Sequence, residues 1–262
     1  GTSGYTFNWS NGSDLEDLTN LMMGNYTVTA TDVNGCTVAH TAAVSEPAPL
    51  QATTITANVS CFGGTNGSVQ LSVSGGVIPY MFNWSSGVNA QTVSSLQAGS
   101  YSVTVYDSHN CTTTLTVNIV EPTAIVLSTA VTNVSCNSGT NGAIDLTVSG
   151  GTSGYTYNWG GGIVTQDRSG LTAGAYTVTV TDANACTVTA NASITQPSAI
   201  AATTAVTRVL CYGNATGGIN LTVSGGTNPY TYNWGGGVIV EDRVNIPAGS
   251  YTVTVTDANS CS

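Results

Sequence analysis

Apolar and polar residues alternate one by one along several short segments of the chain. In residues 67–74 (GSVQLSVS) every second residue from Val69 onward is apolar, and residues 101–106 (YSVTVY) follow the same rule. A period of two places alternate side chains on opposite faces of a β-strand, and the β-branched residues in these segments favour strands. No segment carries the period of an amphipathic helix, so the pattern predicts an all-β protein.

Residues 49–122 contain the fullest set of predicted strands, separated by turns rich in Gly, Asn and Ser. The predicted strands are residues 50–61, 67–76, 79–84, 90–96, 101–107 and 111–120. Six or seven short strands of this kind are typical of a small antiparallel β-sandwich. The segment LQAGSY, in which a Leu closes one strand and a Tyr opens the next, resembles a corner of immunoglobulin-like and fibronectin-like folds.

The same pattern returns every 75 residues without insertions, which identifies a tandem array of one structural unit. It predicts a partial repeat at 1–47 that lacks the first strands, full repeats at 48–122 and 123–197, and a partial repeat at 198–262 that lacks the last strand. Because the sequence begins and ends inside a repeat, we expect it to be a segment of a longer protein. The aromatic residues that keep the spacing are predicted to form the repeat cores: Trp9, Trp84, Trp159, Trp234, Tyr26, Tyr101, Tyr176 and Tyr251.

An aspartate opens the last predicted hairpin of each repeat, at Asp32, Asp107, Asp182 and Asp257. In the segment TDANAC it stands close to an asparagine and a cysteine, a grouping that suits a metal loop, a reactive site or a turn. Asp and Asn side chains bond nearby backbone amides, so we predict a turn. Calcium binding stays open as an alternative, although one acid and one amide fall far short of six to eight oxygen ligands.

The seven cysteines follow the repeat and allow two pairing schemes. Pairing within repeats gives Cys61–Cys111, Cys136–Cys186 and Cys211–Cys261, and leaves Cys36 with a partner upstream of the sequence. Pairing between sequence neighbours gives Cys36–Cys61, Cys111–Cys136 and Cys186–Cys211. We predict the first scheme because a staple inside a small sandwich compensates best for its small core.

The first pairing scheme carries a geometric condition. It requires the loop after the first strand and the last hairpin to lie at the same end of the sandwich. Six strands that alternate in direction meet this condition, whereas seven strands do not. Regular disulfides predict an oxidising compartment and therefore secretion. Zinc is disfavoured because the chain has no C-x-x-C motif, and we predict no cofactor.

Each junction between repeats carries a proline, at Pro47, Pro122 and Pro197. Proline biases the preceding residue towards extended geometry and stiffens the connection. Stacked end to end, strands of about eight residues predict a semi-rigid rod with roughly 35–45 Å per repeat.

Composition narrows the range of functions. The net charge is −10, charged residues make up 6% of the chain, and Lys and Arg together number 3. Nucleic acids and anionic membranes both attract cationic proteins, so we expect neither as a partner. The two histidines, His40 and His109, fall at different places in the repeat, and no nucleophile has a histidine at a repeated spacing. We therefore predict that the chain is not an enzyme.

The combined motifs VSC, LTVSGG, PYTYNW and LTAGAYTVTVTDANAC closely resemble the SprB repeat, which is named for a large cell-surface adhesin of gliding Bacteroidota. Gly4 and Gly154 stand where the motif usually has a proline. The resemblance implies export by the type IX secretion system, a filament anchored to the outer membrane, and interaction with the gliding machinery. It therefore implies an extracellular, cell-surface location.

Three functions fit these observations. The leading hypothesis is a stalk segment of a giant secreted adhesin, whose direct partners are the neighbouring repeats and whose other parts reach an external surface or polysaccharide. The second is an array of weak carbohydrate-binding modules that gains avidity from repetition. The third is a spacer in a large secreted hydrolase.

Overall fold

The structure, a computed structural model, describes residues 1–262 and consists of strands, turns and loops. The predicted all-β tandem array of small antiparallel sandwiches is confirmed. The chain forms two compact units: unit 1 holds Gly1–Val59 and Thr65–Val120, and unit 2 holds Ser60–Gly64 and Glu121–Ser262. No helix is long and apolar enough to cross a membrane.

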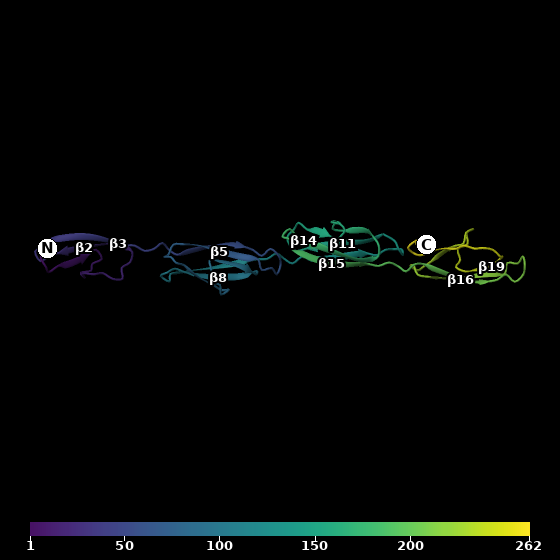
Figure 1. The fold of residues 1–262 in the computed structure, drawn as a ribbon, viewed down its shortest axis with the longest axis horizontal. Coiled ribbons are helices and arrows are strands. Elements are labelled where there is room, and N and C mark those ends of the chain that lie inside the picture. The colour runs from purple at the N-terminus through teal and green to yellow at the C-terminus, as the bar shows by residue number, and fades with distance from the viewer. The chain divides into compact units, whose positions relative to one another are not determined.

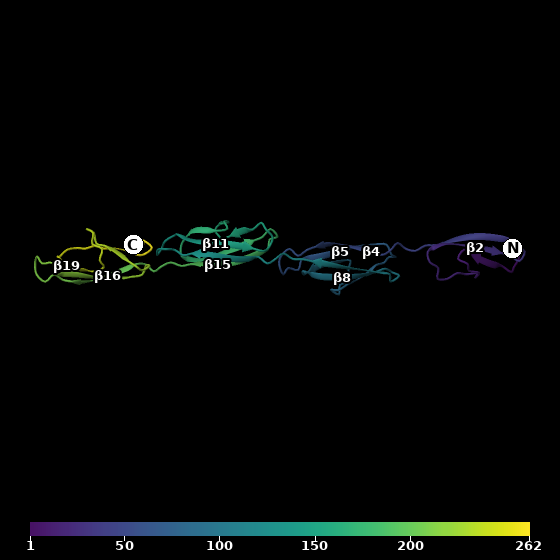
Figure 2. The same cartoon turned by 180° about the vertical axis from the view of Figure 1, so that it is seen from behind.

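Repeat 2 (residues 48–122) is built from two three-stranded antiparallel sheets. One sheet has the order β4-β5-β7 and the other has the order β6-β8-β9. Figures 1 and 2 show the strands from opposite sides. The strands are β4 (Gln51–Ala57), β5 (Gly67–Ser74), β6 (Met81–Trp84), β7 (Thr92–Leu96), β8 (Gly99–Tyr106) and β9 (Thr112–Ile119).

Repeat 3 (residues 123–197) has the same two sheets, in the orders β10-β11-β13 and β12-β14-β15. Its strands are β10 (Val126–Thr132), β11 (Gly142–Ser149), β12 (Thr156–Asn158), β13 (Arg168–Leu171), β14 (Gly174–Thr181) and β15 (Thr187–Ile194). The sequence period is therefore reproduced as a structural period.

Repeats 1 (residues 1–47) and 4 (residues 198–262) contain parts of this plan. Repeat 1 has one sheet, formed by β1 (Thr6–Trp9), β2 (Gly24–Thr31) and β3 (Thr37–Val44). Repeat 4 has a three-stranded sheet and a two-stranded sheet, formed by β16 (Ala201–Thr207), β17 (Gly217–Ser224), β18 (Thr231–Asn233), β19 (Arg243–Ile246) and β20 (Thr254–Thr256).

The third and fourth strands of a repeat run in the same direction. In repeat 3, β12 starts beside the last hairpin, because Thr156 pairs with Thr181. β13 ends at the opposite end of the sandwich, because Leu171 pairs with Gly142. The chain therefore crosses from one sheet to the other between β12 and β13 without reversing.

The alternating apolar residues of the two sheets form the core of each full repeat. Val69, Leu71, Val103 and Val105 are almost completely buried in repeat 2. The positions predicted as core from the 75-residue spacing differ in burial. Trp84 and Trp159 are buried, whereas Trp9, Trp234 and the tyrosines at 26, 101, 176 and 251 are half-buried.

Candidate functional site: disulfide-bonded joints between repeats

Two disulfides join consecutive repeats. Cys61 pairs with Cys186 and Cys136 pairs with Cys261, each with a Cα–Cα distance of 5.7 Å and a sequence separation of 125 residues. In both pairs the first cysteine lies in the loop after the first strand of a repeat. The second cysteine lies in the last hairpin of the next repeat. The joint between repeats is therefore covalently bridged.

The predicted pairings Cys61–Cys111, Cys136–Cys186 and Cys211–Cys261 are wrong. Cys36, Cys111 and Cys211 are free and exposed, so the pairing of sequence neighbours is not formed either.

The reason for the error is the position of the two cysteines of one repeat. Cys186 immediately precedes β15 (Thr187–Ile194). The loop that carries Cys136 lies at the other end of β15, where Val134 N donates to Thr195 O at 3.0 Å. Eight strand residues span roughly 27 Å. A disulfide requires Cα atoms within about 7 Å, so the pair cannot form within a repeat.

The aspartate of each hairpin organises the turn that carries the hairpin cysteine, which is disulfide-bonded in repeats 3 and 4. Oδ1 of Asp182 accepts hydrogen bonds from the backbone N–H groups of Asn184 and Cys186, both at 2.9 Å. Oδ2 accepts the N–H of Thr152 at 2.9 Å. Asp32, Asp107 and Asp257 accept the same three kinds of bond. The oxygens that a calcium ion would need are therefore directed at N–H donors.

These hydrogen bonds make the turn sensitive to acid. The N–H of Thr152 lowers the pKa of Asp182 below its ordinary value of 3.8, burial opposes this shift, and the N–H groups of Cys186 and Asn184 reinforce it. A carboxyl group whose pKa is lower in the folded state stabilises the fold above its unfolded pKa. That contribution is lost as the pH falls through the folded pKa.

We therefore expect the native protein to lose stability below about pH 4. In Asp182→Asn, which replaces the acceptor facing Thr152 with a donor, this acid-dependent loss should be smaller and the melting temperature at pH 7 should be lower. Thermal melts of both proteins between pH 2 and pH 7 test this expectation. Parallel pH profiles for the two proteins would contradict it.

In repeats 3 and 4 an asparagine side chain binds the last hairpin to the loop of the preceding repeat. Nδ2 of Asn184 donates to Ser60 O at 3.0 Å and to Thr152 Oγ1 at 2.9 Å. Asn259 makes the same two bonds, to Ser135 O and Thr227 Oγ1, both at 3.0 Å. Sequence reasoning assigned this asparagine only to its own turn, because nothing in a 75-residue motif indicates a contact 124 residues away.

Hydrogen bonds also hold the loop of the bridging cysteine against the proline-containing linker at the end of the same repeat. Gly63 N donates to Glu121 Oε2 at 2.6 Å, and Ser138 N donates to Gln196 Oε1 at 2.9 Å. Asn137 Nδ2 donates to the carbonyl of Pro197 at 3.0 Å. Glu121 before Pro122 and Gln196 before Pro197 therefore each supply an acceptor for a cysteine loop.

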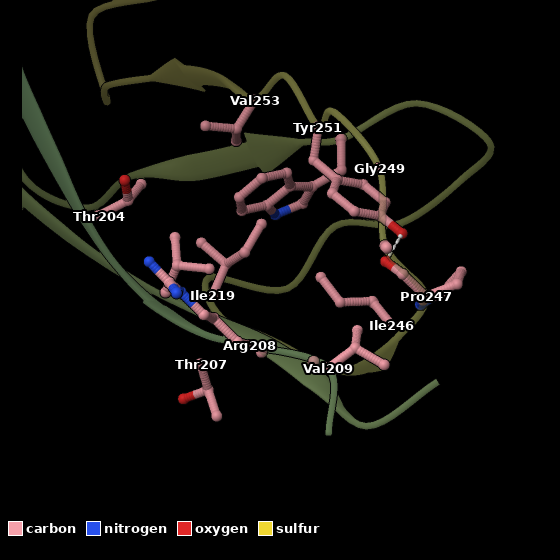
Figure 3. Close-up of a pocket in the computed structure, with 15 residues that line it drawn as sticks. Thr204, Thr207, Arg208, Val209, Ile219, Ile246, Pro247, Gly249, Tyr251 and Val253 are labelled. Atoms are coloured by element: carbon pink, nitrogen blue, oxygen red, sulfur yellow. Dashed lines mark hydrogen bonds between the residues drawn. The ribbon is translucent and has the colours of Figure 1, made fainter. Parts of the chain in front are cut away.

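Repeat 4 contains an apolar cavity of ≈ 500 Å³. Figure 3 shows the ring of Tyr251 at its edge, with the hydroxyl bonded to the carbonyl of Pro247 at 2.8 Å. In repeat 3 the last strand covers the corresponding place: Ile194 is buried, and its Cγ2 lies 3.0 Å from a Cβ built on Gly142. The cavity in repeat 4 therefore corresponds to the space that Ile194 of the last strand fills in repeat 3, and it is not a ligand site that the repeats share.

Comparison with known families identifies the repeats. The model of the SprB repeat matches residues 53–89, 128–162 and 203–238. The chain carries SprB repeats. Each match runs from the first strand of a repeat to just beyond its tryptophan, and thus includes the cysteine of the loop after the first strand, which is Cys61, Cys136 or Cys211. With its two disulfides, the SprB-repeat chain is an extracellular or cell-surface protein of structural, adhesin type.

Other comparisons give remote likenesses. No curated protein matches the chain. The first eight Ig domains of Down Syndrome Cell Adhesion Molecule (DSCAM) isoform 1.30.30 align at 11% identity and a TM-score of 0.38, covering 73% of this chain and 32% of that chain. The amphioxus IgVJ-C2 molecule aligns at 13% identity and 0.24, covering 58% and 99%. Domains 4–9 of the surface layer protein SbsC align at 16% identity and 0.22, covering 78% and 40%.

Proposed function

We propose that these SprB repeats form a stalk segment of a giant secreted cell-surface adhesin, and that the stalk serves surface adhesion and gliding motility. The observation that carries the proposal is the disulfide at each joint of unit 2, which connects one repeat to the next. A spacer that only separates two domains has no need of such bridges. The family resemblance supports the further proposal of export by the type IX system and anchoring to the outer membrane.

Removal of one whole repeat from the adhesin in its producing cell tests this function. Deletion of residues 123–197 removes one whole repeat and keeps the order in which the cysteines alternate. Cys61, in the loop of repeat 2, then lies next to Cys261, in the last hairpin of repeat 4. The stalk function predicts that the cells still adhere and that rupture in force–distance curves occurs closer to the cell. Loss of adhesion in proportion to the number of repeats removed would contradict it and favour avidity.

A second candidate function, weak carbohydrate binding, is favoured by one cavity in repeat 2. This cavity, of ≈ 710 Å³, is lined by Met81, Asn89, Tyr106 and Asn110 among others. None of these four residues occurs at the corresponding position of another repeat, where Tyr106, for example, is replaced by threonine. Aromatic rings and amides without a net charge suit a neutral sugar.

Replacement of Tyr106 and Met81 by threonine, the residue of the other three repeats, gives a variant that keeps strand propensity. We expect binding of neutral oligosaccharides, measured by calorimetry, to weaken at least tenfold in this variant. The matched control is Met22→Thr, an exposed residue elsewhere in unit 1. Equal affinities in all three proteins would remove this second function.

A further inference from the structure

The seven cysteines lie on two continuous covalent routes. Tether A runs along the chain from Cys36 to Cys61, crosses the disulfide to Cys186, and continues along the chain to Cys211. Tether B runs from Cys111 to Cys136 and crosses the second disulfide to Cys261. The three free cysteines are the two ends of tether A and the start of tether B.

Of the strands in each repeat, the tethers contain only the first and the last in the order of the sequence. Tether A consists of β3 and β4 before its disulfide and β15 and β16 after it. These are the last strand of one repeat and the first strand of the next. All strands from β5 to β14 lie between Cys61 and Cys186 and are therefore outside tether A. Most buried core residues of repeats 2 and 3, such as Leu71, Trp84 and Leu146, belong to this excluded part, and only Val59, Ala192 and Ile194 lie on the tether itself.

We propose that the disulfides let tension pass along these tethers and bypass the greater part of each β-sandwich core. The proposal rests on the stalk function, since only a stalk is pulled along its length. A force between Cys36 and Cys211 is carried by residues 36–61 and 186–211, which are 52 residues in total. Without either disulfide the same force is carried by all 176 residues of 36–211.

The tether is already extended in the folded protein. β15 and β16 supply 15 of the residues between Cys186 and Cys211, and strand residues rise about 3.4 Å, close to the maximum that a chain reaches. Only the linker and the loop residues can lengthen, and the linker contains Pro197. Each tether strand is also held by a full antiparallel ladder, β15 on β14 and β16 on β17. Pulling therefore cannot unravel a whole repeat while the disulfide is intact.

Single-molecule pulling on the whole chain tests the proposal directly. DNA handles are attached to the thiols of Cys36 and Cys211 in the variant Cys111→Ser, which removes the third free thiol. At the highest forces we expect a contour length of 52 residues, or about 180 Å at 3.5 Å per residue. After reduction the contour length should rise about 3.4-fold, to that of 176 residues.

A matched variant sharpens the experiment. With Cys61→Ser and Cys186→Ser added, the shortest route runs through residues 36–136, the second disulfide and residues 261–211, which gives 152 residues without a reductant. In the Cys111→Ser protein, a contour length of 176 residues before reduction, unchanged by reduction, would overturn the proposal. Because these lengths depend on connectivity alone, that result would leave the adhesion test of the stalk function unaffected.

Discussion

Gly150→Ala is expected to abolish the stable fold of repeat 3, with a loss of at least about 4 kcal/mol. Gly150 has a φ of +72°, and a Cβ at this position would lie 1.9 Å from the carbonyl oxygen of Ala124. The obstructing atom belongs to the backbone of the linker, which the adjacent bond from Gly151 N to Thr123 O holds at 2.8 Å. No side-chain rotation relieves this overlap.

Gly160→Ala is the matched control. Gly160 also has a positive φ, of +82°, but no atom lies within 4 Å of its Cβ position. Its substitution should cost only the conformational strain of an L-residue, about 1–2 kcal/mol. Hydrogen exchange measured by mass spectrometry should show that β11 and β14 lose protection in Gly150→Ala and keep it in Gly160→Ala. Equal protection in the two variants would show that the fold does not depend on the close contact of Gly150 with the linker.

Removal of the Cys136–Cys261 disulfide should destabilise unit 2 by about 5 kcal/mol in the chain-entropy model, because the bond closes a loop of more than 100 residues. The variant is Cys136→Ser with Cys261→Ser, and denaturant unfolding under non-reducing conditions gives the free energy. The bonds from Asn259 to Ser135 and Thr227 remain in the folded variant, but hydrogen bonds, unlike a disulfide, do not restrict the unfolded chain.

Cys36→Ser and Cys111→Ser are the controls for this measurement, because both thiols are exposed and free. Each should change the free energy of unfolding by less than about 0.5 kcal/mol. If Cys111→Ser instead costs as much as the double variant, Cys111 takes part in a disulfide and the joint assignment is wrong.

The strands and the repeat were predictable from sequence because their causes are local. Alternation around Val69 and Leu71 determines which residues face the core, and the 75-residue spacing of Trp84 and Asp107 shows that the unit recurs. The bonds that Asp107 accepts from His109 N and Cys111 N follow from the chemistry of an aspartate at a hairpin.

The disulfides were not predictable because their geometry depends on a single crossing between the sheets. The segment Ser85–Gly87 looks like a hairpin turn, and a strand after it would run in the reverse direction. In the fold the segment after Trp84 crosses to the other sheet, and β7 continues in the direction of β6. This one missing reversal moves Cys111 to the opposite end of the sandwich from Cys61. The loop that carries Cys61 therefore lies next to the last hairpin of repeat 3, which carries Cys186.

The central claim, that disulfides join consecutive repeats, is tested most directly by tryptic digestion without reduction. The chain has no lysine, and cleavage after Arg168, Arg208 and Arg243 gives the fragments 1–168, 169–208, 209–243 and 244–262. Free thiols are first alkylated in the denatured, unreduced protein, so that the pairs cannot exchange. Mass spectrometry then shows which fragments remain linked.

The account predicts that fragments 1–168, 169–208 and 244–262 remain linked as one species, while 209–243 is released with Cys211 alkylated. Disulfides within repeats would instead link 209–243 to 244–262, and pairing of sequence neighbours would link 169–208 to 209–243. Either of those two species would contradict the bridged joint and, with it, the two tethers.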